Sequence, residues 1–225
     1  MRYYPMFVNL ENRTCLVVGA GAVGKRKLLS LLDFGAGRVH VVDTREPDAG
    51  TKAVLLRENV SFSRREFSEQ DLDGVFLVIA CTSSEAVNGR IAELCEQRGI
   101  LCNIADQPEK SGFIVPATVD RGDLTIAVST AGRSPAVAKR IRKELQENFG
   151  DEYAGLLTVM GRVRPLMLGL DRPTEENTGV FRSLANSDLL AALKARNLDS
   201  AVEILKESLP EPLHSTIPEL LDGLV

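Results

Sequence analysis

Histidine and cysteine, the side chains that most often build metal sites and redox motifs, are scarce in this sequence. Its two histidines are His40 and His214. Its four cysteines are Cys15, Cys81, Cys95 and Cys102. No two cysteines have the C-x-x-C spacing of a zinc or thiol-redox site, and no H-E-x-x-H motif is present. We therefore expect no metal site and interpret the cysteines as small structural hydrophobes.

Long apolar runs and a strong excess of basic charge are also absent. No run of 18 uncharged apolar residues occurs, and the first residues, MRYYPMFVNLENR, lack the basic-then-apolar order of a secretion signal. The formal net charge is −4, whereas a main partner such as nucleic acid or an anionic membrane favours a strongly basic face. We expect neither partner, and we predict a cytoplasmic protein in a reducing compartment.

Apolar strands alternate with amphipathic helices over the first half of the chain. The expected strands cover residues 14–18, 39–42, 60–62, 75–80 and 100–105, and the expected helices cover 22–34 and 84–98. Several strands are short β-branched runs, which is typical of parallel strands covered on both faces. This alternation predicts an α/β fold, a Rossmann-type doubly wound parallel sheet.

The pattern changes near Gly112. Two strand-like runs, 113–119 and 124–129, are joined by Asp-Arg-Gly-Asp and predict a hairpin. A helix over 136–148 follows, with Ser134 as its N-cap and Pro135 at its first position. From residue 151 onward the pattern is helical. We therefore expect three parts: the Rossmann-type domain at 1–111, a small α+β segment at 112–150 and a helical module at 151–225.

A glycine-rich loop, G-A-G-A-V-G, runs from Gly19 to Gly24 between the first strand and the first helix. In this context the first glycine allows a tight turn, the second lets a pyrophosphate approach the backbone, and the third lets helix and strand pack closely. Asp43 follows about twenty residues later, where a carboxylate accepts hydrogen bonds from ribose hydroxyls. Its charge favours NAD over NADP, a preference that Arg45 would soften. The alternative is a glycine turn with an incidental acid.

Candidate site residues also follow two other expected strands, at the edge where ligands of such sheets bind. Thr82 and Ser83 follow the strand at 75–80 and are candidate cofactor contacts, although Ser83 is equally suited to capping the next helix. Asp106 follows the strand at 100–105 and is a candidate general base. Its alternative role is that of a turn former before Pro108. The sequence has no G-x-S-x-G motif and no plausible Cys/His pair to compete with Asp106.

Basic residues gather in and before the helix that follows the hairpin. They are Arg133, Lys139, Arg140, Arg142 and Lys143. Such a cluster in an acidic protein is either a solvated helix face or a site for a ligand with several carboxylates or phosphates.

Together these segments resemble the precorrin-2 dehydrogenase family, the dehydrogenase/ferrochelatase module of siroheme synthases. The similar segments are YYPMFVNLENRTCLVVGAGAVGKRK, ACTSSEAVN, CNIADQPEKSGFIVPA, VSTAGRSPAVAKRIRKEL and FRSLANSDLLAALKARNLDSA. The resemblance implies that the enzyme oxidises precorrin-2 to sirohydrochlorin with NAD. In several family members the same site also inserts ferrous iron to give siroheme.

The resemblance also implies roles for particular residues. The family's essential aspartate corresponds to Asp106. The implied NAD contacts are Gly19, Gly21, Ala22, Val23, Gly24, Asp43 and Thr44, to which we add Thr82. We expect the polycarboxylate substrate to contact Arg133, Ser134, Lys139 and Arg140. The family is a homodimer that exchanges contacts through a segment equivalent to about 112–150.

Some questions stay open at this point. The methyltransferase domain fused to some relatives does not follow in this sequence, so we expect a separate protein to supply precorrin-2. Fe²⁺ or Co²⁺ would be a substrate of a chelatase, and the sequence does not choose between them. Two other functions fit parts of the pattern: an NAD-sensing regulatory module without catalysis, and a chelatase with a vestigial dinucleotide site. The sensor gives no role to Asp106 or to the basic helix.

Overall fold

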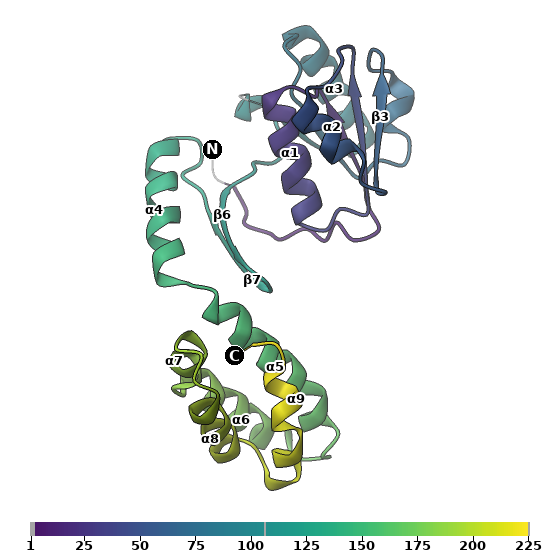
Figure 1. Cartoon of the computed structure of the whole chain (residues 1–225). Coiled ribbons are helices and arrows are strands. Elements are labelled where there is room, and N and C mark those ends of the chain that lie inside the picture. Colours follow the sequence, from purple (N-terminus) through teal and green to yellow (C-terminus); the bar gives the residue numbers. More distant parts are fainter. Residues whose placement is uncertain (1–2, 106, 225) are drawn as a thin grey trace. The chain divides into compact units, whose positions relative to one another are not determined.

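The computed structural model describes residues 3–105 and 107–224. The chain divides into two compact units, Met1–Val115 and Pro116–Val225 (Figure 1).

The first unit is built on a five-stranded parallel sheet in the order β3-β2-β1-β4-β5. Its strands are β1 (Thr14–Val18), β2 (Arg38–Asp43), β3 (Val60–Arg64), β4 (Leu77–Ala80) and β5 (Leu101–Ile104). The central strand, β1, pairs with β2 on one side and with β4 on the other. The chain therefore changes its direction of strand addition at β1, and ligands of such sheets bind at the carboxyl ends of the strands beside this point.

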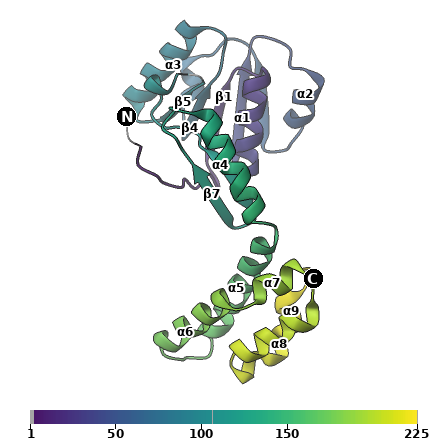
Figure 2. The same cartoon turned by 90° about the vertical axis from the view of Figure 1, so that its left-hand side faces the viewer.

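Helices cover both faces of this sheet. The helices of the first unit are α1 (Ala22–Asp33), α2 (Ala49–Leu55) and α3 (Glu85–Arg98), with 3₁₀ turns η1 (Glu69–Leu72) and η2 (Pro108–Lys110). Figures 1 and 2 show α1 and α2 on one face and α3 on the other. Side chains of β1 alternate accordingly: Val17 packs in the cluster with Leu28 of α1, and Leu16 packs in the cluster with Ile91 of α3. The predicted doubly wound fold is confirmed.

One helix of this unit was not predicted from the sequence. In α2, the Asp48 carboxylate caps the N-terminus by accepting a 2.6 Å hydrogen bond from the Thr51 backbone N–H. The helix is short and contains Gly50 and Thr51, which have low helix propensity. Tertiary packing therefore decides its conformation, although an aspartate after Pro47 was an available N-cap signal.

The second unit begins with an antiparallel hairpin, β6 (Ala117–Arg121) and β7 (Leu124–Val128), followed by α4 (Pro135–Asn148). The hairpin was predicted, but its first strand was placed too early, whereas the second begins at Leu124 as predicted. The first strand extends to Arg121, and the turn consists of Gly122 and Asp123, with Gly122 at φ 62°. Residues 113–116 are not in a strand. Ser134 caps α4, and Pro135 occupies its first position, as predicted.

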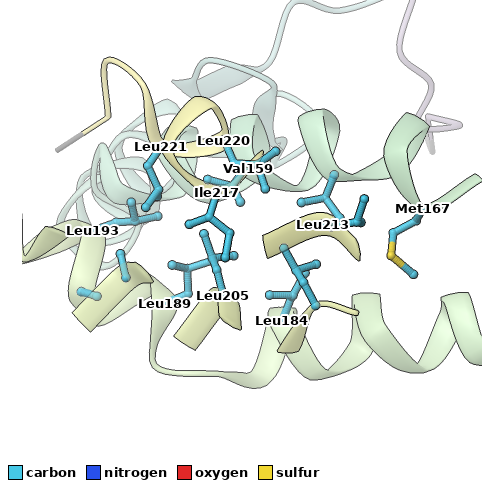
Figure 3. Packing of buried hydrophobic residues seen from close by; sticks show 14 residues of the cluster. Val159, Met167, Leu184, Leu189, Leu193, Leu205, Leu213, Ile217, Leu220 and Leu221 are labelled. Carbon is cyan, nitrogen blue, oxygen red and sulfur yellow. The ribbon is translucent and has the colours of Figure 1, made fainter. Parts of the chain in front are cut away.

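The rest of the second unit is a helical cluster with its own core. Its elements are α5 (Glu152–Leu168), α6 (Thr174–Asn186), α7 (Leu189–Lys194), α8 (Leu198–Ser208), η3 (Glu211–Thr216) and α9 (Ile217–Leu221). Figure 3 shows how Val159, Leu205 and Ile217, from three different helices, meet in this core. Across both units, none of the described helices is long and apolar enough to cross a membrane.

Candidate dinucleotide site

The glycine loop joins β1 to α1 at the carboxyl edge of the sheet, and its three glycines have different surroundings. Gly19 has φ +104°, a backbone conformation that residues other than glycine rarely adopt. A Cβ on Gly24 would lie 1.8 Å from the backbone oxygen of Gly19, so the close approach of helix and strand requires glycine there. A Cβ on Gly21 would meet its nearest neighbour, the Arg45 guanidinium, only at 3.9 Å.

Gly21 is therefore not required by the packing of the protein itself. Its φ of −69° is open to any residue, and a Cβ there would make only an ordinary van der Waals contact, with the Arg45 guanidinium. A glycine that packing does not demand fits a position where another molecule approaches the backbone closely. The loop thus fits the pyrophosphate of a dinucleotide.

The N-terminus of α1 supports the same assignment. Gly21 is its N-cap residue, and within the described part of the chain no side chain caps this end. By contrast, Ser84 caps α3 and Asp48 caps α2. The free backbone N–H groups of the first turn and the positive end of the helix dipole favour an anion at this position.

The carboxylate of Asp43, at the end of β2, connects the second strand to the glycine loop. One oxygen accepts a 2.6 Å hydrogen bond from the backbone N–H of Ala20, and the other accepts a 2.8 Å bond from the backbone N–H of Arg45. The Arg45 Nε lies 3.6 Å from the same carboxylate. Burial alone would raise the pKa of Asp43, but these backbone bonds and the guanidinium outweigh it and lower that pKa.

A cavity of about 480 Å³ lies beside the loop and the carboxyl end of β2. Its lining comes from Val18, Gly19, Val42, Asp43, Thr44, Arg45, Arg65, Glu66, Phe67, Thr82, Ser83, Ser84, Ala86, Val87 and Arg90. The cavity brings together four predicted cofactor residues, namely Gly19, Asp43, Thr44 and Thr82. The other four predicted cofactor residues do not line it: Gly21 is the N-cap of α1, and Ala22, Val23 and Gly24 lie in its first turn. Its volume and its mixed lining suit the adenosine part of a dinucleotide.

Sequence reasoning missed several residues of this cavity. Phe67 and Arg65 come from the connection between β3 and η1, and Arg90 comes from α3. Arg65 donates to Asp71 at 2.8 Å, and Arg90 pairs with Glu69. No local motif marks these positions, since they meet the glycine loop only in the folded sheet.

The loop after β4 is held by a buried asparagine. Thr82 donates its backbone N–H to Asn88 Oδ1 at 3.2 Å, and Asn88 Nδ2 donates to the Thr82 carbonyl at 3.0 Å. Ser84, and not Ser83, caps α3 by accepting a 3.3 Å hydrogen bond from the Val87 N–H. Ser83 is exposed on the cavity wall.

A cysteine lies beneath the glycine loop. Cys81 directly follows β4 and is partly buried, and its thiol donates a 3.1 Å hydrogen bond to the Gly19 carbonyl. Burial raises its pKa to about 12, so the thiol stays protonated at neutral pH. Cys15, Cys95 and Cys102 are buried in the sheet layers, which agrees with their expected structural role.

The predicted base, Asp106, lies outside the described residues. The segments on both sides of it are hydrogen-bonded. Ala105 donates its backbone N–H to the Ala80 carbonyl at 2.9 Å, and the Ser111 hydroxyl donates to the Gln107 carbonyl at 2.9 Å. Among residues 3–105 and 107–224, no group of three or more metal-ligating side chains gathers.

The predicted substrate residues lie in the second unit, at the start of α4. Arg133, Lys139 and Arg140 are exposed, and Arg140 pairs with Glu144 at 3.3 Å. The Ser134 hydroxyl accepts a 3.3 Å hydrogen bond from the Val137 N–H as the N-cap of α4. The Thr130 hydroxyl donates to the Ser134 carbonyl at 3.1 Å and closes the loop that carries Arg133.

The fold and the glycine loop define the first unit as a Rossmann-type dinucleotide-binding protein. Comparison with known families agrees: residues 6–117 match the family described as "Putative NAD(P)-binding", and residues 121–148 match the family described as "Sirohaem biosynthesis protein central". Along these two stretches the chain is similar to NAD(P)-binding and sirohaem biosynthesis proteins, and the match supports a nicotinamide dinucleotide as its cofactor.

Relatives of known name are similar over most of this chain. The siroheme synthase of Thioalkalivibrio sulfidiphilus is 34% identical over 93% of the chain, and that of Photobacterium profundum is 37% identical over 73%. The chain spans only 42% and 34% of these two relatives. The solved structure of SirC, a precorrin-2 dehydrogenase, matches with a TM-score of 0.74 and 25% identity, over 92% of this chain and 98% of SirC.

Proposed function

We propose that this protein oxidises precorrin-2 to sirohydrochlorin with NAD as the hydride acceptor. The observation that carries the proposal is the space at Gly21, a glycine that the protein's own packing does not require. It lies in a chain that resembles SirC along almost the whole length of both proteins. We also propose a cytoplasmic setting, because all four cysteines are unpaired thiols, as expected in a reducing compartment.

The residues of the first unit bind and orient the cofactor. The loop from Gly19 to Gly24 and the free N–H groups of α1 hold the pyrophosphate, while the cavity beside Asp43 and Thr82 holds the adenosine part. When bound, the nicotinamide supplies the hydride-accepting chemistry. Oxidation of the reduced macrocycle also releases a proton, and we assign Asp106 as the carboxylate that accepts it.

We propose NAD, and not NADP, as the cofactor in use. The Asp43 carboxylate lines the adenosine cavity, and its lowered pKa keeps it charged at neutral pH. A negative charge there repels a 2′-phosphate. Arg45 lies beside it with most of its side chain exposed, so it weakens this discrimination without removing it.

We propose that the basic start of α4 binds the carboxylates of the tetrapyrrole. Arg133, Lys139 and Arg140 are all exposed within two turns of helix and its preceding loop. Arginine and lysine at such spacing suit a ligand with several carboxylates. Ser134 fixes the start of the helix from which these side chains project.

We propose a second activity, insertion of Fe²⁺ into sirohydrochlorin, because the relatives are named siroheme synthases. Metal insertion displaces two pyrrole protons, and Asp106 would accept them as it accepts the proton of the oxidation. This activity is tested by adding Fe²⁺ or Co²⁺ to sirohydrochlorin with and without the protein. The proposal predicts that the sirohydrochlorin absorbance is lost faster with the protein than with metal alone.

We propose that the chain acts as a homodimer joined through residues 112–150. A two-stranded hairpin alone is marginally stable. In this chain the β6–β7 hairpin buries only Val119, and α4 buries only Ala138, among the described residues. Val137 stays 42% exposed. Sedimentation equilibrium tests this proposal: the wild type should be a dimer, and a monomer at micromolar concentration would contradict it.

An anaerobic assay tests the oxidation itself. Enzymatically generated precorrin-2 and NAD are mixed with the protein, and the absorbance of NADH and of sirohydrochlorin is followed together. The proposal predicts one NADH for each sirohydrochlorin. If NAD binds and no NADH forms, the protein is a dinucleotide sensor or a chelatase, and the oxidoreductase proposal fails.

A further inference from the structure

We propose that Asn88 is a positioning residue for the dinucleotide site: its side-chain amide sets the position of the loop after β4. This inference rests on the proposed cofactor site and adds a residue that lies on α3 and does not line the cavity.

The contact between Asn88 and Thr82 has the geometry of a backbone pairing. The amide of Asn88 donates to the Thr82 carbonyl at 3.0 Å and accepts from the Thr82 N–H at 3.2 Å. It also accepts a 2.8 Å hydrogen bond from the Thr82 hydroxyl. Asparagine carries a donor and an acceptor side by side, so one side chain satisfies both backbone groups of a loop residue that no strand pairs.

Burial makes this pairing important. Asn88 is only 5% exposed, so water is not available to replace a lost partner of its side chain. The Thr82 hydroxyl in turn accepts a 3.1 Å hydrogen bond from the Ser84 N–H, which continues the network into the N-cap of α3. Removal of the amide would leave the Thr82 backbone unpaired and free to shift.

A shift of Thr82 would reach the glycine loop directly. A Cβ placed on Gly19 would lie 2.7 Å from the Cys81 carbonyl oxygen and 3.0 Å from the Thr82 nitrogen, so the two loops are already in close contact. Thr82, Ser83 and Ser84 also line the adenosine cavity. Asn88 therefore acts on the cofactor through the wall of the cavity, without a contact of its own.

The test compares Asn88→Ala and Asn88→Asp with the wild type in the full-length chain. Asn88→Asp keeps the shape of the side chain and replaces the donor to the Thr82 carbonyl by a carboxylate oxygen. A folding failure of the alanine variant therefore leaves the test intact. Asn59→Ala is the matched control, because Asn59 also ties its side chain to a backbone carbonyl of the same unit, that of Ala36 at 3.0 Å. Asn59 does not line the cavity.

The measurements are NADH affinity by fluorescence titration, KM for NAD and kcat at saturating NAD. We expect both Asn88 variants to raise the Kd for NADH and the KM for NAD about tenfold, with kcat within about twofold of wild type. Asn59→Ala should leave the Kd unchanged even if it lowers Tm. A merely structural role for Asn88 would lower Tm without this split between KM and kcat.

Unchanged NADH affinity in a folded Asn88 variant would overturn the inference while the proposed function stands. Absence of NADH binding by the wild type would overturn the proposed cofactor site and, with it, the role of Asn88. The two failures are thus distinguished by the wild-type titration alone.

Discussion

The Asp43 carboxylate accepts a 2.6 Å hydrogen bond from the backbone N–H of Ala20, which links the end of the second strand to the glycine loop after the first. Asp43 therefore shapes the loop as well as facing the cavity. A carboxylate without this hydrogen bond would contact only a bound ribose. The Asp43 carboxylate also holds the glycine loop in place when no ligand is bound.

Replacement of Asp43 by asparagine should change how stability depends on pH. The pKa of Asp43 is lower in the folded chain than its ordinary 3.8, so its stabilising contribution is present above that value and is lost as pH falls through the folded pKa. Urea unfolding at several pH values measures this. The difference in unfolding free energy between wild type and Asp43→Asn should be largest near neutral pH and should narrow below 3.8. A difference that grows as pH falls would contradict this account.

Alanine substitutions at two glycines of the loop should have different effects, one on cofactor binding and the other on stability. Gly21→Ala should leave Tm within a few degrees of wild type and weaken NADH binding by about tenfold or more, because the added Cβ meets the ligand and not the protein. Gly24→Ala should destabilise the first unit by about 1–3 kcal/mol or more, because its Cβ overlaps the Gly19 carbonyl. Thermal unfolding and fluorescence titration distinguish the two.

Gly89→Ala serves as the control for these glycine variants. Gly89 lies within α3, and a Cβ there meets nothing within 4 Å. Alanine should keep the NADH affinity and raise stability by about 0.5–1 kcal/mol. If Gly21→Ala binds NADH as tightly as Gly89→Ala does, no pyrophosphate approaches Gly21.

Arg45 should determine how much activity the protein keeps with NADP as the cofactor. Its Nε lies 3.6 Å from Asp43, and 70% of its side chain is exposed, so its effect is that of a screened surface charge. Arg45→Ala should lower kcat/KM for NADP about fivefold and change that for NAD little. Arg57→Ala removes a positive charge from an exposed position of the same unit outside the cavity, and it should leave kcat/KM unchanged for both NAD and NADP. Equal losses for NAD and NADP in Arg45→Ala would exclude a role in discrimination.

Lys139 should contribute to substrate affinity through its charge. Lys139→Ala should raise the KM for precorrin-2 about fivefold at low salt, and this effect should shrink at high salt because exposed charges are screened. Lys206 is an exposed lysine on α8, and Lys206→Ala is the matched control. An equal response of the two variants would mean that the basic start of α4 is a solvated face.

The strands and the glycine loop could be predicted because their signals are local. Thr14–Val18 is a short apolar run covered on both faces, and Asp43 follows the next such run directly. The hairpin shift had a local cause as well, since Arg121 was assigned to the turn although only Gly122 needs a positive φ there.

The rest of the site could not be predicted because it depends on distant contacts. Arg65, Phe67 and Arg90 reach the cavity from separate segments of the chain. The pairing of Asn88 with Thr82 is local, but no sequence motif marks it, because it needs the first turn of α3 to fold back over its own entry loop. The roles of Thr82, Asp106 and the basic start of α4 stay predictions.

The most direct test of the central claim is a single-turnover measurement with Asp106→Asn. The variant and the wild type are each mixed anaerobically with NAD and precorrin-2, and NADH formation is followed beside NADH affinity. We predict that the variant binds NADH with wild-type affinity and forms NADH at least about a hundredfold more slowly. Wild-type rates of NADH formation in Asp106→Asn would contradict the assignment of Asp106 as the base. Absence of NADH with the wild type would contradict oxidation of precorrin-2 by this protein.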